Sequence, residues 1–427
     1  MLSRLNRHVS NSTQGGVRGR EIYSNFPPTR GGEKLKDREF KDKYRSQVKE
    51  HYNLFIIVIV LVILGILMQY SASKSSITVL KKSLSFGIIS LMLFAVIQQI
   101  NIKNITILLG KYFYFMSFIP IFLLLTPLAV ESHGAKRWVQ VFGIQFQVAE
   151  LVKLSVILFE AYIINQLSRY KLNKRGEYIK ILLLWTVGII PALLLFILSK
   201  DLSSSFVILI ITFIITFVAT NKTWLHLVTA GSAITIVSLY IRNITLNLPS
   251  QKELNHLPFR IGRIAAWINP EKYESDQGYQ VLQSLYAVGS GGFFGKGLGK
   301  SIIKTRMPEA HTDMIFSIIC EELGAFGGIL IIVAIAYIVY LIVLISVNAE
   351  TLLESIISLG VAVHITFQSI VNIGVCLNLI PNTGIGLVFI SYGGTALITQ
   401  MMEIGIVVSI SKRHYICKVK RQINEKE

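Results

Sequence analysis

Charged side chains are scarce in this chain. Of its 427 residues, 15% are Asp, Glu, Lys or Arg, whereas 52% are hydrophobic, and the mean hydropathy is +0.57. Soluble globular domains carry about 25% charged residues. The composition therefore excludes an ordinary soluble protein and predicts a chain that crosses a membrane many times.

Cysteine is also rare, and no secretory signal is apparent. Cys320, Cys376 and Cys417 lie in or beside apolar segments without paired spacing, which argues against a disulfide framework and a cysteine-based zinc site. We expect free thiols. The first apolar run begins at Leu54, too late for a signal peptide, so we expect the N-terminal arm to stay in the cytoplasm.

Acidic residues are outnumbered by basic ones. The chain has 42 Lys and Arg against 24 Asp and Glu, a formal charge of +18. These bases lie beside apolar segments, where they set membrane topology and contact anionic lipid. We therefore expect no nucleic-acid partner.

Most of the sequence consists of long apolar segments. A helix needs about 20 apolar residues to cross a hydrocarbon core about 30 Å thick, which predicts an all-α polytopic membrane protein with about ten transmembrane helices. The predicted spans are residues 54–70, 80–99, 109–129, 148–166, 178–198, 203–220, 224–241, 313–346, 353–377 and 390–411. We expect a basic, disordered arm over 1–52, a transmembrane domain over 53–411 and a basic tail over 412–427.

Basic residues predict the orientation. The arm, the loop 169–175 and the tail 412–421 are basic, and an even number of spans places all three on one side, the cytoplasm. The loop 134–147 and the large loop 242–312, between the seventh and eighth helices, then face outward. Both contain Lys or Arg against the usual rule, which favours a functional role for those bases.

The first outward loop combines bases with an aromatic residue. Lys136 and Arg137 offer several hydrogen-bond donors to a phosphate. Trp138 beside them is either an interfacial anchor, the usual role of a Trp at the end of a span, or part of a binding site.

Several ionisable residues lie in or next to predicted spans. Glu150 and Lys153 share one helix face, and an ionisable residue costs about 3 kcal/mol at the bilayer centre. They should therefore pair with each other or face a polar cavity. Asp201, between the fifth and sixth spans, is either a helix N-cap or a site residue.

The large outward loop is chemically dense. Glu271, Glu274 and Asp276 supply three carboxylates within six positions, and the glycine-rich stretch 289–301 contains Lys296 and Lys300. Backbone amides of such a stretch can approach a ligand closely. The stretch lacks the phosphate-loop spacing, so a nucleotide triphosphatase is not expected.

Two further stretches attract attention. Glu309 and His311 lie beside Thr312 and Asp313, but the spacing is not that of a zinc-binding HExxH motif, so no protein-bound metal is expected there. Residues 378–394 contain Pro381 and several glycines. Exposed backbone at membrane depth is tolerated where it is buried in protein or lines a cavity, so we predict a re-entrant segment before the tenth helix, with a plain turn as the alternative.

In this order and spacing, the motifs resemble those of the SEDS family of bacterial shape, elongation, division and sporulation proteins. The resemblance covers roughly residues 54–411, and residues 297–301 are more similar to the FtsW and SpoVE branch than to the RodA branch. The motifs lie at 134–138, 147–153, 278–284, 289–301, 308–313, 321–324 and 381–394. The resemblance implies a ten-helix peptidoglycan glycosyltransferase that polymerises lipid II at the outer face of the bacterial cytoplasmic membrane. It also implies a class B penicillin-binding transpeptidase and other divisome or elongasome membrane proteins as partners.

The resemblance also implies site residues. The family's essential acid, shortly before Gly278-Tyr279-Gln280, falls on Asp276, and its functional Trp falls on Trp138. Because the spacer before Gly278 is shorter than usual, Glu274 is kept as a substitute for Asp276. Two motifs depart from the family: residues 147–150 read Gln-Val-Ala-Glu for Gln-Pro-Ser-Glu, and 200–203 read Lys-Asp-Leu-Ser for Pro-Asp-Leu-Gly.

The expected chemistry is an inverting glycosyl transfer with a lipid diphosphate as leaving group. Asp276 would accept the proton of the acceptor hydroxyl. The cations that would neutralise the diphosphate are Lys136, Arg137, Lys296 and Lys300. A divalent cation, Mg²⁺ or Mn²⁺, could share that work. The predicted substrate-binding residues are Lys136, Arg137, Trp138, Glu150, Lys153, Asp201, Lys296, Lys300, Ser301, Glu309, His311, Thr312, Asp313 and Ser391.

Two functions of other classes compete with this one. The intramembrane residues Glu150, Lys153 and Glu403 are also typical of a transporter, here one that flips lipid II. A membrane scaffold for the division or elongation machinery would tolerate neutralisation of the loop acids, whereas an enzyme would not.

Overall fold

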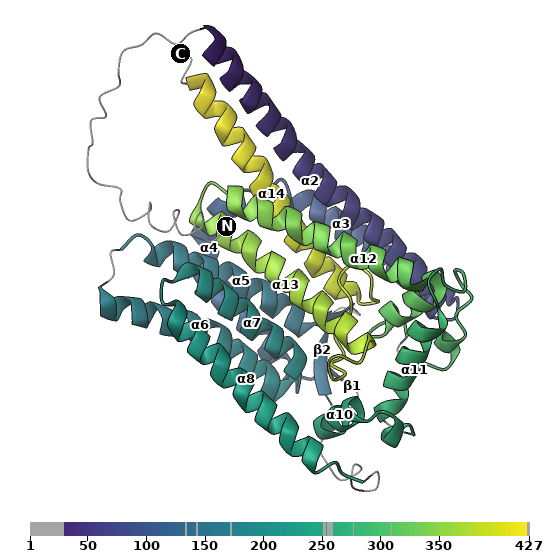
Figure 1. The fold of residues 1–427 in the computed structure, drawn as a ribbon. Helices are drawn as coiled ribbons and strands as arrows, with labels where there is room; N and C mark the ends of the chain where they lie inside the picture. The colour runs from purple at the N-terminus through teal and green to yellow at the C-terminus, as the bar shows by residue number, and fades with distance from the viewer. Residues whose placement is uncertain are drawn as a thin grey trace.

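The computed structural model describes residues 30–132, 135–141, 144–170, 173–250, 253, 259–275, 277–308 and 310–424 (Figure 1). Within them, nine helices are long and apolar enough to cross a membrane. A tenth long helix, α5, contains three charged residues. The ten helices are α2 (Arg30–Ala72), α3 (Ile77–Ile97), α4 (Ile102–Leu123), α5 (Val148–Leu167), α6 (Lys174–Leu198), α7 (Leu202–Ala219), α8 (Thr223–Leu246), α12 (Ile315–Asn348), α13 (Leu352–Cys376) and α14 (Gly394–Asn424). The predicted all-α polytopic architecture is confirmed.

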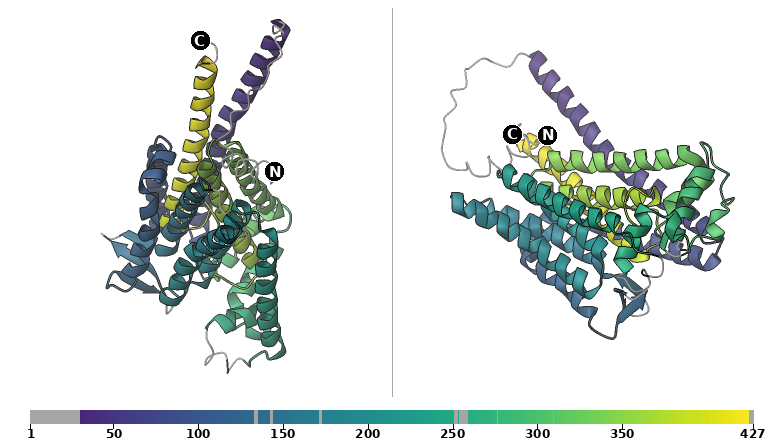
Figure 2. Two further views of the ribbon diagram at one scale, coloured as in Figure 1. Left: turned by 90° about the vertical axis from the view of Figure 1, so that its left-hand side faces the viewer. Right: turned by 60° about the horizontal axis from the view of Figure 1, so that its bottom comes forward.

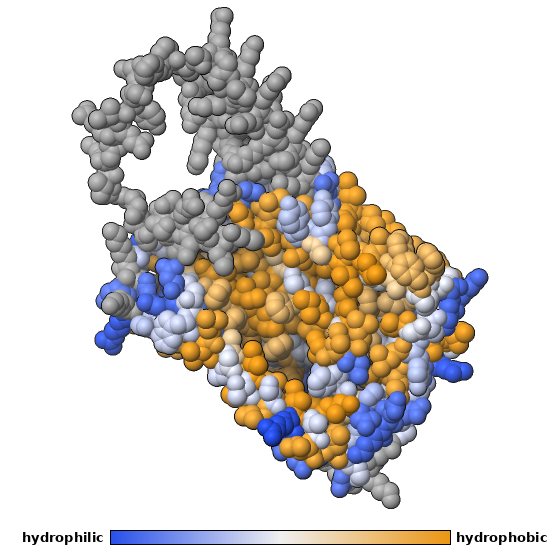
Figure 3. Space-filling view, in the orientation of Figure 1, coloured by the Kyte–Doolittle hydropathy of each residue, from blue (hydrophilic) through white to orange (hydrophobic). Residues whose placement is uncertain are grey.

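The bundle has a buried centre and an apolar outside. In α13 and α14, 78% of the most apolar stretch is buried inside the protein, against 6% in α8 at the edge. Figure 3 shows apolar residues over the middle of the visible face and hydrophilic residues towards its ends. This distribution suits a membrane, because lipid favours apolar side chains on the outside of the bundle.

Two predicted spans have wrong boundaries. The third helix begins at Ile102, seven residues before the predicted start, because the side chain of Asn101 caps it by accepting a hydrogen bond from the Asn104 amide (3.3 Å). It ends at Leu123, before Pro127. The last helix begins at Gly394, so residues 390–393 belong to the preceding non-helical segment.

The N-terminal arm is helical from Arg30 onward, so the prediction of disorder is wrong for residues 30–52. The stretch is rich in Glu, Lys and Arg, which favour helix. It also extends an existing membrane helix, which removes the cost of nucleation. Residues 1–29 lie outside the described residues. The ends of α2 and α14 project together beyond one end of the bundle (Figure 2).

The loop between α4 and α5 forms a small antiparallel sheet, which was not predicted from the sequence. Its strands β1 (Ala129–Ser132), β2 (Ala135–Val141) and β3 (Ile144–Gln147) lie in that order. Successive side chains on a strand point to opposite faces. Val139 is buried in the apolar core together with Ile121 and Val148, so Arg137 shares the face that points into the bundle, and Trp138 is on the other face.

Short helices occupy the large loop between α8 and α12. They are α10 (Phe259–Ile268), η1 (Glu271–Tyr273), α11 (Gln277–Ser290) and η2 (Ile303–Thr305). The loop docks on a kink in α12, where Gly324 has φ of 74°. There the amides of Ala325 and Phe326 donate to the carbonyls of Gly292 and Phe293 (2.9 and 3.0 Å). The glycine-rich turn thus takes the hydrogen-bonding groups that the kink releases.

The segment between α13 and α14 is non-helical and reaches into the bundle. Residues 387–390 are at most 2% exposed. The Gln69 side chain donates to the carbonyl of Ile390 (2.8 Å), and the Gln400 side chain accepts from the amide of Phe389 (2.8 Å). Side chains of the neighbouring helices therefore satisfy backbone that has no helical partner, as burial requires.

Candidate active site

Residues 382–386, which we call the hub segment, collect hydrogen bonds from distant parts of the chain. Their carbonyls accept from Arg263 on α10 to Asn382 (3.1 Å), Ser203 on α7 to Thr383 (2.9 Å), Asn372 on α13 to Ile385 (2.8 Å) and Gln368 on α13 to Gly386 (3.4 Å). The side chain of Asn382 donates to Gln280 on α11 (2.8 Å). The hub segment is thus the point where the transmembrane helices meet the large loop.

Opposite charges converge on Gly384 in the hub segment. This residue has φ of 75°, and a Cβ atom there would lie 3.4 Å from Asp313 Oδ2 and 3.7 Å from Arg137 Nη1. A glycine satisfies the backbone conformation and leaves the space between the carboxylate and the guanidinium unfilled by a side chain.

Two more charged residues, Arg263 and Asp201, lie near the pair of Asp313 and Arg137 at Gly384. Burial and the charge of Arg137 lower the pKa of Arg263, while the charges of Asp313 and Asp201 raise it. These interactions place Arg137, Asp201 and Asp313 each near Arg263. We call Arg137, Asp201, Arg263 and Asp313 the charged cluster. Arg263 is a candidate site residue that was not predicted from the sequence.

Buried polar atoms around the hub segment lack hydrogen-bond partners within the described residues. They include Arg137 Nε, Glu150 Oε2, Asn372 Oδ1 and Thr383 Oγ1. Most buried polar groups in proteins are paired with protein or water. Such a concentration is therefore what a polar ligand or ordered water would occupy.

The two motif-rich stretches of the sequence meet beside the charged cluster. Ser391 Oγ donates to the carbonyl of Thr312 (2.7 Å), and the amide of Tyr392 donates to the carbonyl of His311 (2.9 Å). The rings of His311 and Tyr392 lie 5.2 Å apart. The structure therefore brings together four predicted site residues, His311, Thr312, Asp313 and Ser391.

Glu150 and Lys153 form a buried ion pair below the hub segment. Lys153 Nζ is 2.7 Å from Glu150 Oε1 and donates to Gln368 Oε1 (2.6 Å). Gln368 Oε1 also meets His364 Nε2 (2.8 Å), and His364 Nδ1 meets both carboxylate oxygens of Glu403 (2.9 Å each). The predicted pairing is confirmed, and it belongs to a larger network across α5, α13 and α14. The sequence analysis missed His364, although a lone His in an apolar span was a signal.

Asp201 caps α7, as one of its two interpretations predicted. Its carboxylate accepts from the amide (3.1 Å) and the hydroxyl (2.8 Å) of Ser204. Because it also belongs to the charged cluster, the cap holds an acid at the site.

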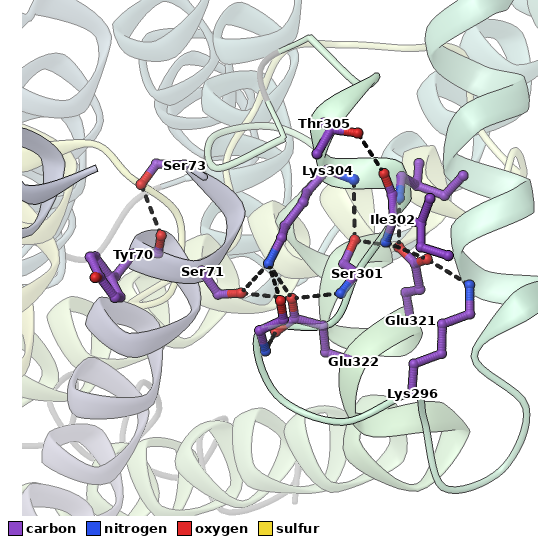
Figure 4. A network of polar contacts seen from close by, with 12 residues as sticks. Tyr70, Ser71, Ser73, Lys296, Ser301, Ile302, Lys304, Thr305, Glu321 and Glu322 are labelled. Carbon is purple, nitrogen blue, oxygen red and sulfur yellow. Dashed lines mark hydrogen bonds and ion pairs between the residues drawn. The ribbon is translucent and has the colours of Figure 1, made fainter. Parts of the chain in front are cut away.

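The glycine-rich turn takes part in a second network (Figure 4). Lys296 Nζ is 2.7 Å from Glu321 Oε1, and the Ser301 hydroxyl donates to Glu321. Lys304 Nζ is 3.1 Å from Glu322 Oε1 and donates to the hydroxyl of Ser71 at the end of α2 (3.1 Å). These groups fasten the turn to α12 and α2, and a role for Lys296 and Ser301 in substrate binding stays a prediction.

The remaining predicted residues are not drawn into the charged cluster by any described contact. Asp276 and Glu309 lie outside the described residues. Glu274, Lys136 and Lys300 are exposed, and Trp138 is half-buried on β2. Asp276 directly precedes α11, the helix whose Gln280 binds the hub segment.

The described residues contain no group of three or more His, Cys, Asp or Glu side chains that could hold a metal ion. A divalent cation therefore stays a prediction. Cys320 and Cys376 are buried free thiols, whereas the side chain of Cys417 lies outside the described residues.

Comparison with known proteins identifies the family. A model of the FtsW/RodA/SpoVE cell cycle proteins matches residues 51–416. The chain belongs to this family. It is similar to a probable peptidoglycan glycosyltransferase FtsW of Coxiella burnetii, with 33% identity over 70% of this chain and 77% of the relative. It is also similar to the stage V sporulation protein E of Bacillus subtilis, with 30% identity over 84% of this chain and 96% of the relative.

Solved structures share the fold. A chain from a peptidoglycan synthase complex that coordinates polymerization and crosslinking aligns with a TM-score of 0.70 at 23% identity, over 85% of this chain and 98% of that chain. The rod shape determining protein RodA of Thermus thermophilus aligns with a TM-score of 0.62 at 24% identity, over 85% of this chain and 97% of that chain. The ten-helix arrangement is therefore the family fold.

Proposed function

We propose that this chain is a peptidoglycan glycosyltransferase that polymerises lipid II. The observation that carries the proposal is the charged cluster over Gly384, where Arg137 and Arg263 lie beside orphaned buried polar atoms. A pair of guanidinium groups suits a diphosphate, because each presents a fork of donors to phosphate oxygens. Family membership and the printed names of relatives support the same chemistry.

In the proposed glycosyl transfer, each step is assigned to a residue of the charged cluster or of the large loop. The 4-hydroxyl of one sugar attacks the anomeric carbon of a glycan held on undecaprenyl diphosphate. The bond from that carbon to the diphosphate oxygen breaks, and the diphosphate leaves as an anion. Arg137 and Arg263 stabilise the charge that develops on it. Asp276, with Glu274 as its substitute, takes the hydroxyl proton as general base. Asp201 and Asp313 keep the two arginines in place.

The site faces outward in this proposal. α14 begins eight residues after the hub segment and ends where the tips of α2 and α14 project beyond the bundle. The hub segment is thus at the opposite end of the bundle from the basic tail. Lys and Arg favour the cytoplasmic side, which gives cytoplasmic termini and an active site on the outer face of the bacterial cytoplasmic membrane.

A transpeptidase partner is part of the proposal. A related chain belongs to a complex that coordinates polymerization and crosslinking. A glycan polymerase delivers the strands that a class B penicillin-binding protein crosslinks, so the two activities gain from being held together. Other division or elongation membrane proteins would join this complex.

The test uses purified protein and fluorescent lipid II, with polymer measured by gel electrophoresis. Arg137→Gln should lower the polymerisation rate by about 100-fold, the cost of losing one transition-state contact, and Arg137→Lys should retain part of it. Arg306→Gln, at an exposed arginine, is the matched control. Full activity of Arg137→Gln would refute the assignment of the site.

A lipid II flippase is the second candidate, because the buried network of Glu150, Lys153, His364 and Glu403 is typical of transport proteins. Liposomes with labelled lipid II distinguish the two functions. Movement of lipid II across the bilayer without polymer would support the flippase.

A further inference from the structure

Glu160 on α5 is a buried carboxylate without a counter-charge. Its exposed fraction is 0%, and neither Oε1 nor Oε2 has a hydrogen-bond partner within the described residues. The ion pairs among those residues do not include it. An isolated charge in a bundle interior is too costly to leave uncompensated. Glu160 therefore holds either a proton or a cation, because the described side chains provide no positive partner.

Two threonine hydroxyls on α7 also lack hydrogen-bond partners within the described residues. The Thr212 hydroxyl interacts with the Glu160 carboxyl, although the two groups do not reach the geometry of a full hydrogen bond. Thr216 Oγ1, one turn along, also lacks a partner within the described residues. Threonines in helices usually donate to the carbonyl four residues back. Thr220, Thr366 and Thr399 do so here, whereas Thr212 and Thr216 do not.

Neighbouring contacts place the helix segments that carry these oxygens against one another. A Cβ atom on Gly360 of α13 would touch both Ile157 of α5 and Ile215 of α7, so the three helices meet at one level. Glu160 is three residues beyond Ile157, and Thr212 and Thr216 flank Ile215 on their helix. On α6, Gly188 lies directly against the Thr212 hydroxyl. α5, α6 and α7 pack side by side (Figure 1), and the site is closed between them.

We propose that Glu160, Thr212 and Thr216 bind an alkali-metal ion. Two carboxylate and two hydroxyl oxygens are hard ligands, and one carboxylate matches a single positive charge. A proton would engage one carboxylate oxygen and leave the others unpaired, whereas a bound metal ion would serve as the missing partner of all four. The site is separate from the charged cluster, and the inference does not depend on the proposed glycosyl transfer.

Thermal unfolding of the purified full chain in detergent tests the proposal. The Tm is measured in NaCl, KCl and N-methylglucamine chloride at constant ionic strength, at pH 7 and pH 9. Because the ion binds the folded state, the wild-type Tm should rise by about 2 °C for each tenfold increase in the concentration of the bound ion above its Kd. The NaCl and KCl arms identify which ion binds.

Variants locate the effect. Glu160→Gln should abolish the response to the ion, and Thr216→Val, which keeps the shape of the side chain, should weaken the apparent affinity about tenfold, the loss of one polar ligand worth about 1.4 kcal/mol. Thr366→Val is the matched control, because Thr366 satisfies its hydroxyl on the Ala362 carbonyl. If Glu160→Gln does not fold, equilibrium binding of radioactive sodium and rubidium to wild type and Thr216→Val decides the question.

Two outcomes would overturn the proposal. One is a Tm that is the same in all three salts at both pH values, or that responds to ions equally in Glu160→Gln. The other is a Tm that falls as the pH rises in wild type alone, with no difference between salts, since the carboxyl then holds a proton instead of an ion.

Discussion

Lys153 donates to Gln368 Oε1 from 2.6 Å, and this bond fixes the hydrogen positions in the buried network. An ammonium group only donates, so the atom facing Lys153 is the amide oxygen. His364 Nε2, which is 2.8 Å from the same oxygen, must donate to it. His364 Nδ1 then meets the Glu403 carboxylate at 2.9 Å. Two lone pairs cannot face each other at that distance, so His364 and Glu403 share one proton.

This arrangement makes the four ionisable groups neutral as a set, and it predicts different effects for two substitutions. Glu403→Gln should change stability by less than about 1 kcal/mol, because an amide can replace the shared proton with its own. His364→Leu should cost about 3 kcal/mol or more, because Glu403 is left buried without a partner. Thermal unfolding in detergent measures both. The double variant His364→Leu/Glu403→Leu should recover most of the loss, and no recovery would contradict the shared proton.

Gly384 offers a direct probe of the charged cluster. In Gly384→Ala, a methyl group enters the space between Asp313 and Arg137, where we place the diphosphate. Polymerisation should fall at least tenfold, by exclusion of the ligand, while the backbone strain costs about 1 kcal/mol. Gly299→Ala is the matched control, since Gly299 has φ of 79° and no atom near its Cβ position. Equal activity of the two variants would place the substrate elsewhere.

The sequence predicted the helices and the motifs, but not how the motifs meet. Apolar run length located all ten long helices, because lipid imposes that length on the helices that cross it. The hub segment could not be foreseen, since its partners come from three separate stretches: Ser203 on α7, Arg263 on α10, and Gln368 and Asn372 on α13. Arg263 gave no signal because it sits in a short helix with an ordinary amphipathic pattern. The sheet over 129–147 was missed because its strands have four to seven residues, too few for a clear alternation.

The ion pair of Lys304 with Glu322 should contribute much more to the free energy of unfolding than the ion pair of Lys222 with Glu177. Glu322 is fully buried, and its pair with Lys304 ties the glycine-rich turn to α12 and α2. Glu322→Gln leaves Lys304 buried with its charge unbalanced, which should cost about 3 kcal/mol. Glu177→Gln, in an exposed pair with Lys222 at 3.4 Å, should cost less than about 1 kcal/mol. A comparison of the two Tm values checks this, and similar losses would show that the network in Figure 4 contributes little.

The positive charge of Arg263 should contribute more to binding the diphosphate of the substrate than to the stability of the fold. Its guanidinium donates to the carbonyl of Asn382 from α10, so it reaches the hub segment from the large loop. Arg263→Gln keeps a side-chain donor but removes the positive charge. The KM for lipid II should rise about tenfold and kcat should fall as well, because the charge binds the diphosphate in the ground state and more strongly as it leaves.

Arg260 is the matched control, because it lies one turn away, over the ring of Phe196 and near the Lys200 carbonyl. Arg260→Gln should leave KM and kcat within about twofold of the wild-type values, the usual effect of a surface substitution. Raising the salt concentration should weaken lipid II binding by the wild type more than by Arg263→Gln, since screening acts on the charge that the variant lacks. If the salt dependence of the two proteins is the same, Arg263 does not bind the diphosphate.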